Sequence, residues 1–202
     1  DASKNSFDFQ CPLMSLPILF NTNMENIPEI NKYFKCDDQK VNLWRNMLGL
    51  SKNKKNLGIA VSGNPNQVHE NRRKISLEYF LPFRKNFKIF IIQKNLYSND
   101  EILLNNTDDM VYLGKKSQWS DFNDTSAIVQ NMDHVISIDT SLIHLAASIN
   151  KEAYLLLSKT ADWRWSDEKL DSPKWYDNIT IMRQKNKNNW EEVIKELQEK
   201  LI

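Results

Sequence analysis

Continuous apolar runs alternate with segments of helical spacing along residues 56–202, and this alternation constrains the fold more than any other feature. The run within 88–93 (KIFIIQ) is apolar at consecutive positions rather than at every second one. Strands of this kind are buried on both faces, as in a parallel sheet that helices cover. The sequence therefore predicts an α/β fold: a Rossmann-like parallel sheet with helices on both faces.

The expected elements follow from where each run begins and ends. The expected strands occupy 57–62, 88–93, 110–113, 134–138, 153–157 and 179–182, and the expected helices occupy 76–84, 99–105, 124–132, 141–149 and 189–201. Asn99 or Asp100 is the expected N-cap of the second helix, and Asp124 is that of the third.

Residues 1–55 do not take part in the alternation. The apolar stretch 11–20 is interrupted by Pro12 and Pro17, residues 42–50 have helical spacing, and 52–56 form a polar linker. We therefore expect two parts: an N-terminal arm with its linker at 1–55, packed on the main unit, and the Rossmann-like domain at 56–202.

Composition excludes several function classes. The 27 basic and 26 acidic residues give a net charge of +1, which is not the basic excess of a nucleic-acid-binding protein. No apolar run approaches the roughly 18 residues that a membrane span needs, and no signal peptide is visible, so we expect a cytoplasmic protein. Cys11 and Cys36 are expected to be free thiols, and the three histidines lack the spacing of metal ligands.

The loop after the first expected strand has the composition of a ligand-binding loop. In an open parallel sheet, ligands bind beyond the carboxyl ends of the strands. Ser62, Gly63 and Asn64 follow such an end, and glycine lets a backbone approach a ligand closely. The basic run 72–74 would neutralise phosphate. A solvated loop with a charged patch is the alternative, and the Walker pattern is absent.

A second candidate loop joins the strand 134–138 to the next helix. Asp139, Thr140 and Ser141 stand at the helix start, where unpaired N–H groups and a partial positive charge favour anions. His144 follows one turn later on the same face. These groups would surround one anion. In the alternative interpretation, Asp139 or Thr140 only caps the helix, and His144 is a core histidine.

Two other enzyme classes lack their motifs in this sequence. No GxSxG elbow is present, which argues against a serine hydrolase. No GxGxxG fingerprint is present, which argues against a domain that binds NAD.

Taken in order along the chain, a set of short motifs resembles the glycosyltransferase domain that follows tetratricopeptide repeats in many bacterial proteins. That family is related to the heptosyltransferases of glycosyltransferase family nine and, more distantly, to O-linked GlcNAc transferase. The motifs are 7–17 (FDFQCPLMSLP), 62–66 (SGNPN), 121–125 (DFNDT), 135–141 (VISIDTS) with 144–146 (HLA), 162–165 (DWRW), 172–173 (SP) and 183–184 (RQ).

The resemblance implies the C-terminal half of a GT-B fold, in which two Rossmann-like domains face each other across a cleft. It implies a nucleotide-diphosphate sugar as donor, a protein or glycan as acceptor, and neither cofactor nor metal. The donor-binding residues that carry over are Ser62, Gly63, Asn64, Arg73, Lys94, Asp139, Thr140, Ser141 and His144.

The sequence departs from the family pattern in one important respect. By this resemblance we expect only the final segment of the first Rossmann domain, at about residues 1–50, and in related enzymes that domain is thought to supply the catalytic base. Two interpretations follow: a glycosyltransferase or a fragment of one, and a non-catalytic module that binds a nucleotide sugar or a protein. An uncovered interdomain face would allow homo-oligomers.

Trp163 and Trp165 flank Arg164 in a polar stretch. Two roles are open for these rings. They would either cover the donor as a lid or pack the last strand against the sheet.

Overall fold

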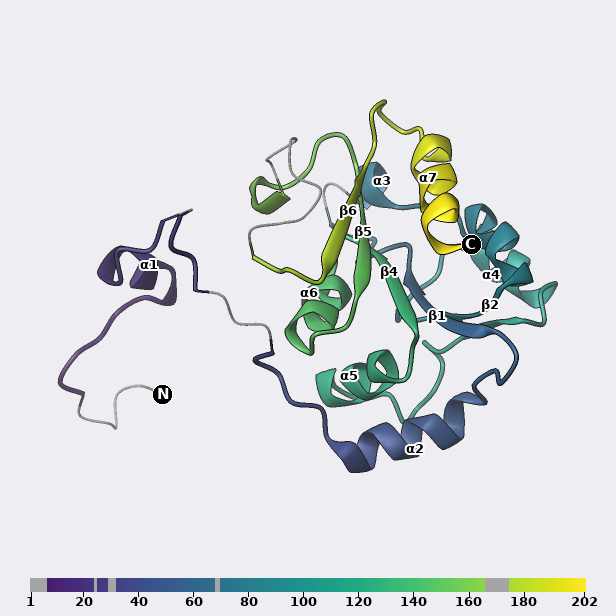
Figure 1. Cartoon of the computed structure of the whole chain (residues 1–202), viewed down its shortest axis with the longest axis horizontal. Helices are drawn as coiled ribbons and strands as arrows, with labels where there is room; N and C mark the ends of the chain where they lie inside the picture. Colours follow the sequence, from purple (N-terminus) through teal and green to yellow (C-terminus); the bar gives the residue numbers. More distant parts are fainter. Residues whose placement is uncertain (1–6, 24, 29–31, 68–69, 166–174) are drawn as a thin grey trace.

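The chain forms a parallel sheet of six strands in the order β3-β2-β1-β4-β5-β6 (Figure 1). The computed structural model describes residues 7–23, 25–28, 32–67, 70–165 and 175–202. Every neighbouring pair of strands is parallel, which confirms the predicted Rossmann-like sheet. The strands are β1 Lys55–Ala60, β2 Phe87–Ile91, β3 Met110–Tyr112, β4 His134–Ile138, β5 Ala153–Leu157 and β6 Ile179–Arg183.

Helices cover both faces of the sheet, as predicted (Figure 1). The helices α2, α5 and α6 pack on one face, and α4, α7 and the 3-10 helix η3 pack on the other. Successive residues of β1 alternate between the two cores, because strand side chains point to opposite faces in turn. The bounds are α2 Asp38–Leu48, η3 Leu77–Lys85, α4 Ser98–Asn105, α5 Phe122–Gln130, α6 Ser141–Ser148 and α7 Glu191–Leu201.

The start of α5 differs from the prediction by one turn. Asp121, not Asp124, is the N-cap, and its side chain accepts a hydrogen bond from the Asp124 N–H at 2.9 Å. Asp124 stands at the third helical position and completes a capping box by accepting from the Asp121 N–H. Its carboxylate also bonds Lys40 and Trp44 of α2, so it ties the two helices together.

The predicted cap of α4 is also wrong. Tyr97 occupies the N-cap position without a side-chain cap, and the carboxyl of Asp100 instead accepts a hydrogen bond from the Leu77 N–H at 3.0 Å. The helix expected at 76–84 is the 3-10 helix η3, with Pro82 inside it. Proline lacks the N–H that the interior of an α-helix requires.

The N-terminal quarter divides into a packed helix and an exposed segment. Helix α2 lies in the core, where the Trp44 ring is fully buried. By contrast, no described residue of 7–28 is buried, and Phe9 is 95% exposed. The predicted packing of the arm on the main unit therefore buries none of these residues, although Met14, Ile27 and Pro28 line a cavity together with residues of the main unit. The segment holds only the one-turn helix α1 Leu16–Leu19 and the 3-10 turn η2 Leu13–Ser15, which are too short to present a continuous apolar face.

Cys11 and Cys36 are both free, as predicted. Among the helices in the described ranges, none combines the length and the apolar character that crossing a bilayer requires.

Candidate functional site

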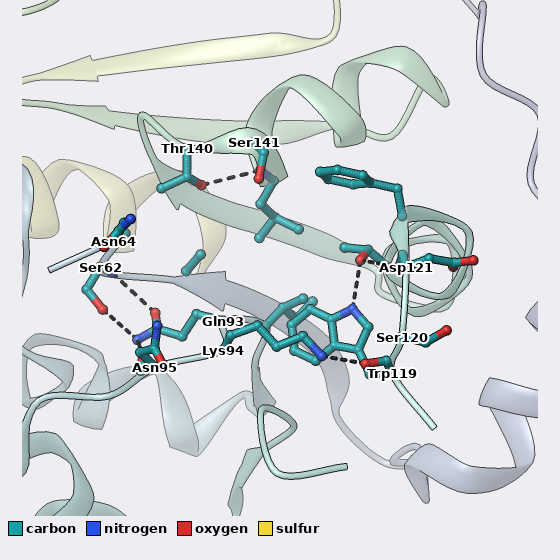
Figure 2. A pocket seen from close by; sticks show the side chains of 16 residues that line it. Ser62, Asn64, Gln93, Lys94, Asn95, Trp119, Ser120, Asp121, Thr140 and Ser141 are labelled. Atoms are coloured by element: carbon teal, nitrogen blue, oxygen red, sulfur yellow. Dashed lines mark hydrogen bonds between the residues drawn. The ribbon is translucent and has the colours of Figure 1, made fainter. Parts of the chain in front are cut away.

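A cavity of about 560 Å³ opens at the carboxyl ends of β1, β2 and β4, between the starts of α5 and α6 (Figure 2). Strand β1 pairs with β2 on one side and β4 on the other, so the chain leaves these strands in opposite directions. Such a reversal of strand order leaves a crevice in which ligands bind. We call this cavity the switch-point pocket. Ser62, Gly63, Asn64, Lys94, Thr140 and Ser141, all predicted from the sequence, line it together.

Gln93 holds the first loop of the pocket in place. Its Oε1 atom accepts hydrogen bonds from the N–H groups of Val61, at 2.8 Å, and Ser62, at 3.2 Å. Its Nε2 atom donates to the Ser62 hydroxyl at 2.7 Å and to the Asn95 carbonyl at 2.8 Å, as Figure 2 shows in part. Gln93 is not among the site residues predicted from the sequence. The sequence does carry a signal for Gln93, because a glutamine at the end of an apolar strand is buried and its amide needs hydrogen-bond partners.

Gly63 lines the pocket and packs directly against the side chains of Glu70 and Arg73. Its N–H donates to Glu70 Oε1 at 2.5 Å. A Cβ atom at this position would lie 2.5 Å from Arg73 Nη2 and 3.0 Å from Glu70 Oε2. A side chain at this position would therefore displace the Arg73 guanidinium from the ion pair that packs beneath the loop.

Arg73 joins the two candidate loops to each other. It ends the short helix α3 Glu70–Arg73, its Nε donates to the Glu70 carboxylate at 2.7 Å, and its Nη1 donates to the Asp139 carbonyl at 2.5 Å. Its Nη2 also donates to Gln67. The Glu70 side chain is only 2% exposed, so the pair is largely buried. Arg73 lies outside the switch-point pocket and lines a neighbouring cavity of about 250 Å³, together with Arg72 and Asp139.

Lys94 supplies the positive charge of the switch-point pocket. Its Nζ lies 4.0 Å from the centre of the Trp119 ring and donates to the Trp119 carbonyl at 2.5 Å (Figure 2). The Trp119 indole N–H in turn donates to the Thr125 hydroxyl at 2.7 Å. Within the described ranges, no carboxylate forms an ion pair with Lys94. An anion in the pocket would therefore meet a cation that is not already neutralised.

The start of α6 forms the opposite wall. Thr140 is the N-cap, and its hydroxyl accepts a hydrogen bond from the Leu142 N–H at 3.3 Å. Ser137 lies 3.0 Å from the same hydroxyl and holds it in place. Ser141, the first helical residue, is exposed and lines the pocket. Thr140 thus caps the helix, and the positive end of the helix dipole faces the cavity.

His144 does not share this pocket. Its ring stacks on Trp165 with centroids 5.3 Å apart, and its Nδ1 lies 3.0 Å from the Tyr176 hydroxyl. Burial lowers the pKa of His144, so the imidazole is neutral at pH 7. Its Nε2 lies 4.0 Å from the Asp139 carboxylate, beyond hydrogen-bond distance. The structure therefore brings the hydroxyls and the helix start together but places the imidazole on another side of α6.

Among the described residues, no group of three or more His, Cys, Asp or Glu side chains is arranged to hold a metal ion. The switch-point pocket itself is lined by a single carboxylate, Asp121, and by no histidine, as far as its described lining goes. Because the Asp121 carboxylate accepts the Asp124 N–H, the pKa of Asp121 is lowered. Its carboxylate is thus already engaged in capping α5.

No protein-family model matches the sequence, and no curated protein matches it. Solved structures do match the fold. The E. coli ADP-heptose LPS heptosyltransferase II is 14% identical with a TM-score of 0.56, and the match covers 86% of this chain and 55% of that one. A family nine glycosyl transferase from Veillonella parvula is 9% identical with a TM-score of 0.57, covering 84% and 47%. The E. coli heptosyltransferase WaaC with ADP is 13% identical with a TM-score of 0.52, covering 76% and 47%.

The fold is glycosyltransferase-like. These neighbours are GT-B glycosyltransferases, and the likeness at such low identity concerns the fold alone. The chain spans about half the length of each neighbour.

Proposed function

We propose that this chain binds a nucleotide-diphosphate sugar in the switch-point pocket, as the donor-binding part of a metal-independent glycosyltransferase of GT-B type. The observation that carries the proposal is the meeting of the α6 start, the loop at 62–64 and Lys94 around one cavity at the strand ends. A helix start and an unneutralised lysine are suited to a diphosphate. The solved heptosyltransferase with bound ADP-2-deoxy-2-fluoro heptose has a similar fold.

The lining of the pocket is mixed in a way that suits a nucleotide. Ser62, Thr140 and Ser141 supply hydroxyl groups, and Ile92, Trp119 and Phe122 supply apolar surface. The diphosphate would bind to the hydroxyl groups, the α6 start and Lys94, and the nucleoside would contact the apolar side chains. Asp139 lines the neighbouring cavity, where it would orient the donor sugar.

Sugar transfer would use the same groups more strongly in the transition state. As the bond between the sugar and the phosphate breaks, negative charge grows on the diphosphate. Fixed N–H dipoles at the start of α6 and the Lys94 ammonium group would stabilise that charge without reorganising. Removing one such donor typically slows a reaction by roughly 10² to 10³.

A second candidate is a module that binds the nucleotide sugar without transferring it. The observation that favours this candidate is the lining of the pocket, in which Asp121 is the one carboxylate of the described residues and is already hydrogen bonded. A chain without its own base would need a partner domain to activate an acceptor. Release of nucleoside diphosphate from a nucleotide sugar by the isolated chain would show that the chain is an enzyme.

The direct test is a thermal-shift and calorimetric screen with UDP-, GDP-, ADP- and dTDP-sugars. A ligand at 100 times its Kd stabilises the folded state by about 2.7 kcal/mol, so at least one donor is expected to raise the Tm clearly. If none of them does at millimolar concentration, the switch-point pocket is not a nucleotide-sugar site.

A matched pair of variants localises the binding. Ser141→Asp places a carboxylate at the first position of α6, where it favours the helix dipole but repels a diphosphate. Ser98→Asp makes the same change at the first position of α4, and both serines are exposed. We expect Ser141→Asp alone to abolish the thermal shift, and equal behaviour of the two variants would refute binding at α6.

A further inference from the structure

A second cavity, of about 460 Å³, lies beside α6 and shares no lining residue with the switch-point pocket. We call it the aromatic cavity. Its chemistry comes from four aromatic rings, one imidazole and one guanidinium group, contributed by segments far apart in the sequence. These residues are Tyr33, His144, Trp163, Arg164, Trp175 and Tyr176, and the apolar side chains of Met14, Ile27 and Pro28 from the N-terminal segment complete the lining.

Two tryptophan rings form an exposed wall of the aromatic cavity. Trp163 and Trp175 meet nearly at right angles, at 81°, with centroids 6.2 Å apart. The Trp175 indole N–H donates to the Arg164 carbonyl at 3.1 Å, and the Arg164 guanidinium lies 4.8 Å from the Trp163 ring. Trp165, in the same 3-10 turn η4 Trp163–Trp165, is 2% exposed, whereas Trp163 is 60% exposed. Packing in the core therefore explains Trp165, whereas most of the Trp163 ring lies at the surface.

The polar groups of the aromatic cavity are largely without net charge. The Tyr176 hydroxyl contacts His144 Nδ1 at 3.0 Å, and burial raises the pKa of Tyr176 while it lowers the pKa of His144. Arg164 is paired with Asp162 at 2.8 Å. At neutral pH the cavity thus offers hydrogen-bonding groups and flat apolar rings without an unneutralised cation, and a phosphate or carboxylate ligand would find no counterion.

We propose that the aromatic cavity binds a neutral pyranose that belongs to the acceptor glycan. Its identification as the acceptor rests on the proposed sugar transfer. A pyranose has a face of C–H groups that packs on an indole ring and a rim of hydroxyls that bonds to imidazole and phenol groups. This combination of apolar walls and a few placed polar groups is the usual composition of a small-molecule site.

The position of the aromatic cavity suits an acceptor. Asp139 lines the cavity beside Arg73, and its carboxylate lies 4.0 Å from His144 Nε2 at the edge of the aromatic cavity. Thr140 and Ser141, the next residues along the chain, line the switch-point pocket. A sugar held by Trp163 and His144 would therefore lie at the same end of α6 as the diphosphate of the donor.

The test follows the indole N–H signals of the chain by NMR during titration with methyl glycosides of glucose, galactose, mannose and N-acetylglucosamine. We expect at least one glycoside to shift the Trp163 and Trp175 signals saturably, with a Kd of about 1 to 10 mM, while Trp119 and Trp44 stay still. The Trp163→Ala change should weaken binding by roughly tenfold or more, and because this ring is exposed the variant should keep its fold. Tyr176→Phe keeps the ring and removes the hydroxyl, so it should weaken binding by a smaller factor.

Several outcomes would overturn the assignment. These are the absence of any saturable shift, a shift of Trp119 alone, and equally tight binding of benzyl alcohol, which has no hydroxyl rim. A nucleotide sugar that displaces the glycoside would show that the cavity holds the donor sugar instead. Failure of the proposed function is distinguishable, because nucleotide sugars would then leave the Tm unchanged while the glycoside shifts persist.

Discussion

The two cavities beside α6 are built in different ways. The switch-point pocket is formed by the ends of adjacent parallel strands, and hydrogen bonds to backbone groups and a buried ion pair hold its loops. The aromatic cavity is formed by side chains from separate segments that meet through ring contacts. One therefore offers directed polar groups with a free positive charge, and the other offers shape and neutral hydrogen-bonding groups.

In the two proposals, one helix takes part in two sites of different chemistry. The start of α6 lines the first cavity through Thr140, Ser141 and Leu142, while His144, one turn further, lines the second. Helix dipole effects fall off within the first turn, so His144 lies largely outside the field that favours an anion. Variants that affect one cavity and spare the other test whether the two are independent.

The largest expected effect is the loss of folding stability caused by Arg73→Ala. This change would leave the carboxylate of Glu70 buried without its cation, and breaking a buried ion pair typically costs about 3 to 5 kcal/mol. Urea unfolding should show this loss for Arg73→Ala, whereas Arg72→Ala serves as the neighbouring control and should change stability little. If Arg73→Ala kept full stability but lost nucleotide binding, Arg73 would be a ligand-binding residue rather than a link between the loops.

A smaller loss is expected from Gln93→Ala. The change would leave the N–H groups of Val61 and Ser62 without their acceptor, and an unsatisfied buried donor costs about 1 to 3 kcal/mol. Hydrogen exchange should become faster at these two amides, and nucleotide-sugar affinity should fall because the loop is no longer held. The indole signals of the aromatic cavity should not move. Their movement would mean that the two cavities are coupled.

The affinity change expected from Lys94→Ala is roughly tenfold, equivalent to about 1.4 kcal/mol. Lys94 is the cation of the switch-point pocket, and part of its charge is already taken up by the Trp119 ring and carbonyl. Calorimetry with the best nucleotide sugar measures the change, and Lys115→Ala, an exposed lysine outside the pocket lining, is the matched control. Equal affinities for the two variants would remove Lys94 from the site.

The sequence predicted what depends on local pattern. The runs at 134–138 and 153–157 are strands with those same bounds, because continuous apolar stretches end at polar or small residues. It missed what depends on contacts between distant segments, such as the bridge made by Gln93 across the ends of β1 and β2 and the stacking of His144 on Trp165. The direction of the imidazole is set by residues 21 and 32 positions away, and helical spacing alone does not determine it.

The smallest effect concerns pH and separates His144 from the groups of the switch-point pocket. Burial lowers the pKa of His144 below its ordinary value of 6.5, against the smaller influence of Asp139, while Arg164 and Asp162 act in opposite directions. The unfolded chain therefore binds a proton more readily, so the stability due to the neutral imidazole is complete above pH 6.5 and declines as the pH falls below it. The pKa of His134 is lowered as well, so part of the decline in stability belongs to that residue.

We expect His144→Gln to flatten the fall in unfolding free energy below pH 6.5 and to remove any pH dependence of glycoside binding there. His134→Gln should flatten only the stability curve, and identical binding curves for His144→Gln and the parent chain would mean that the imidazole does not face the bound sugar.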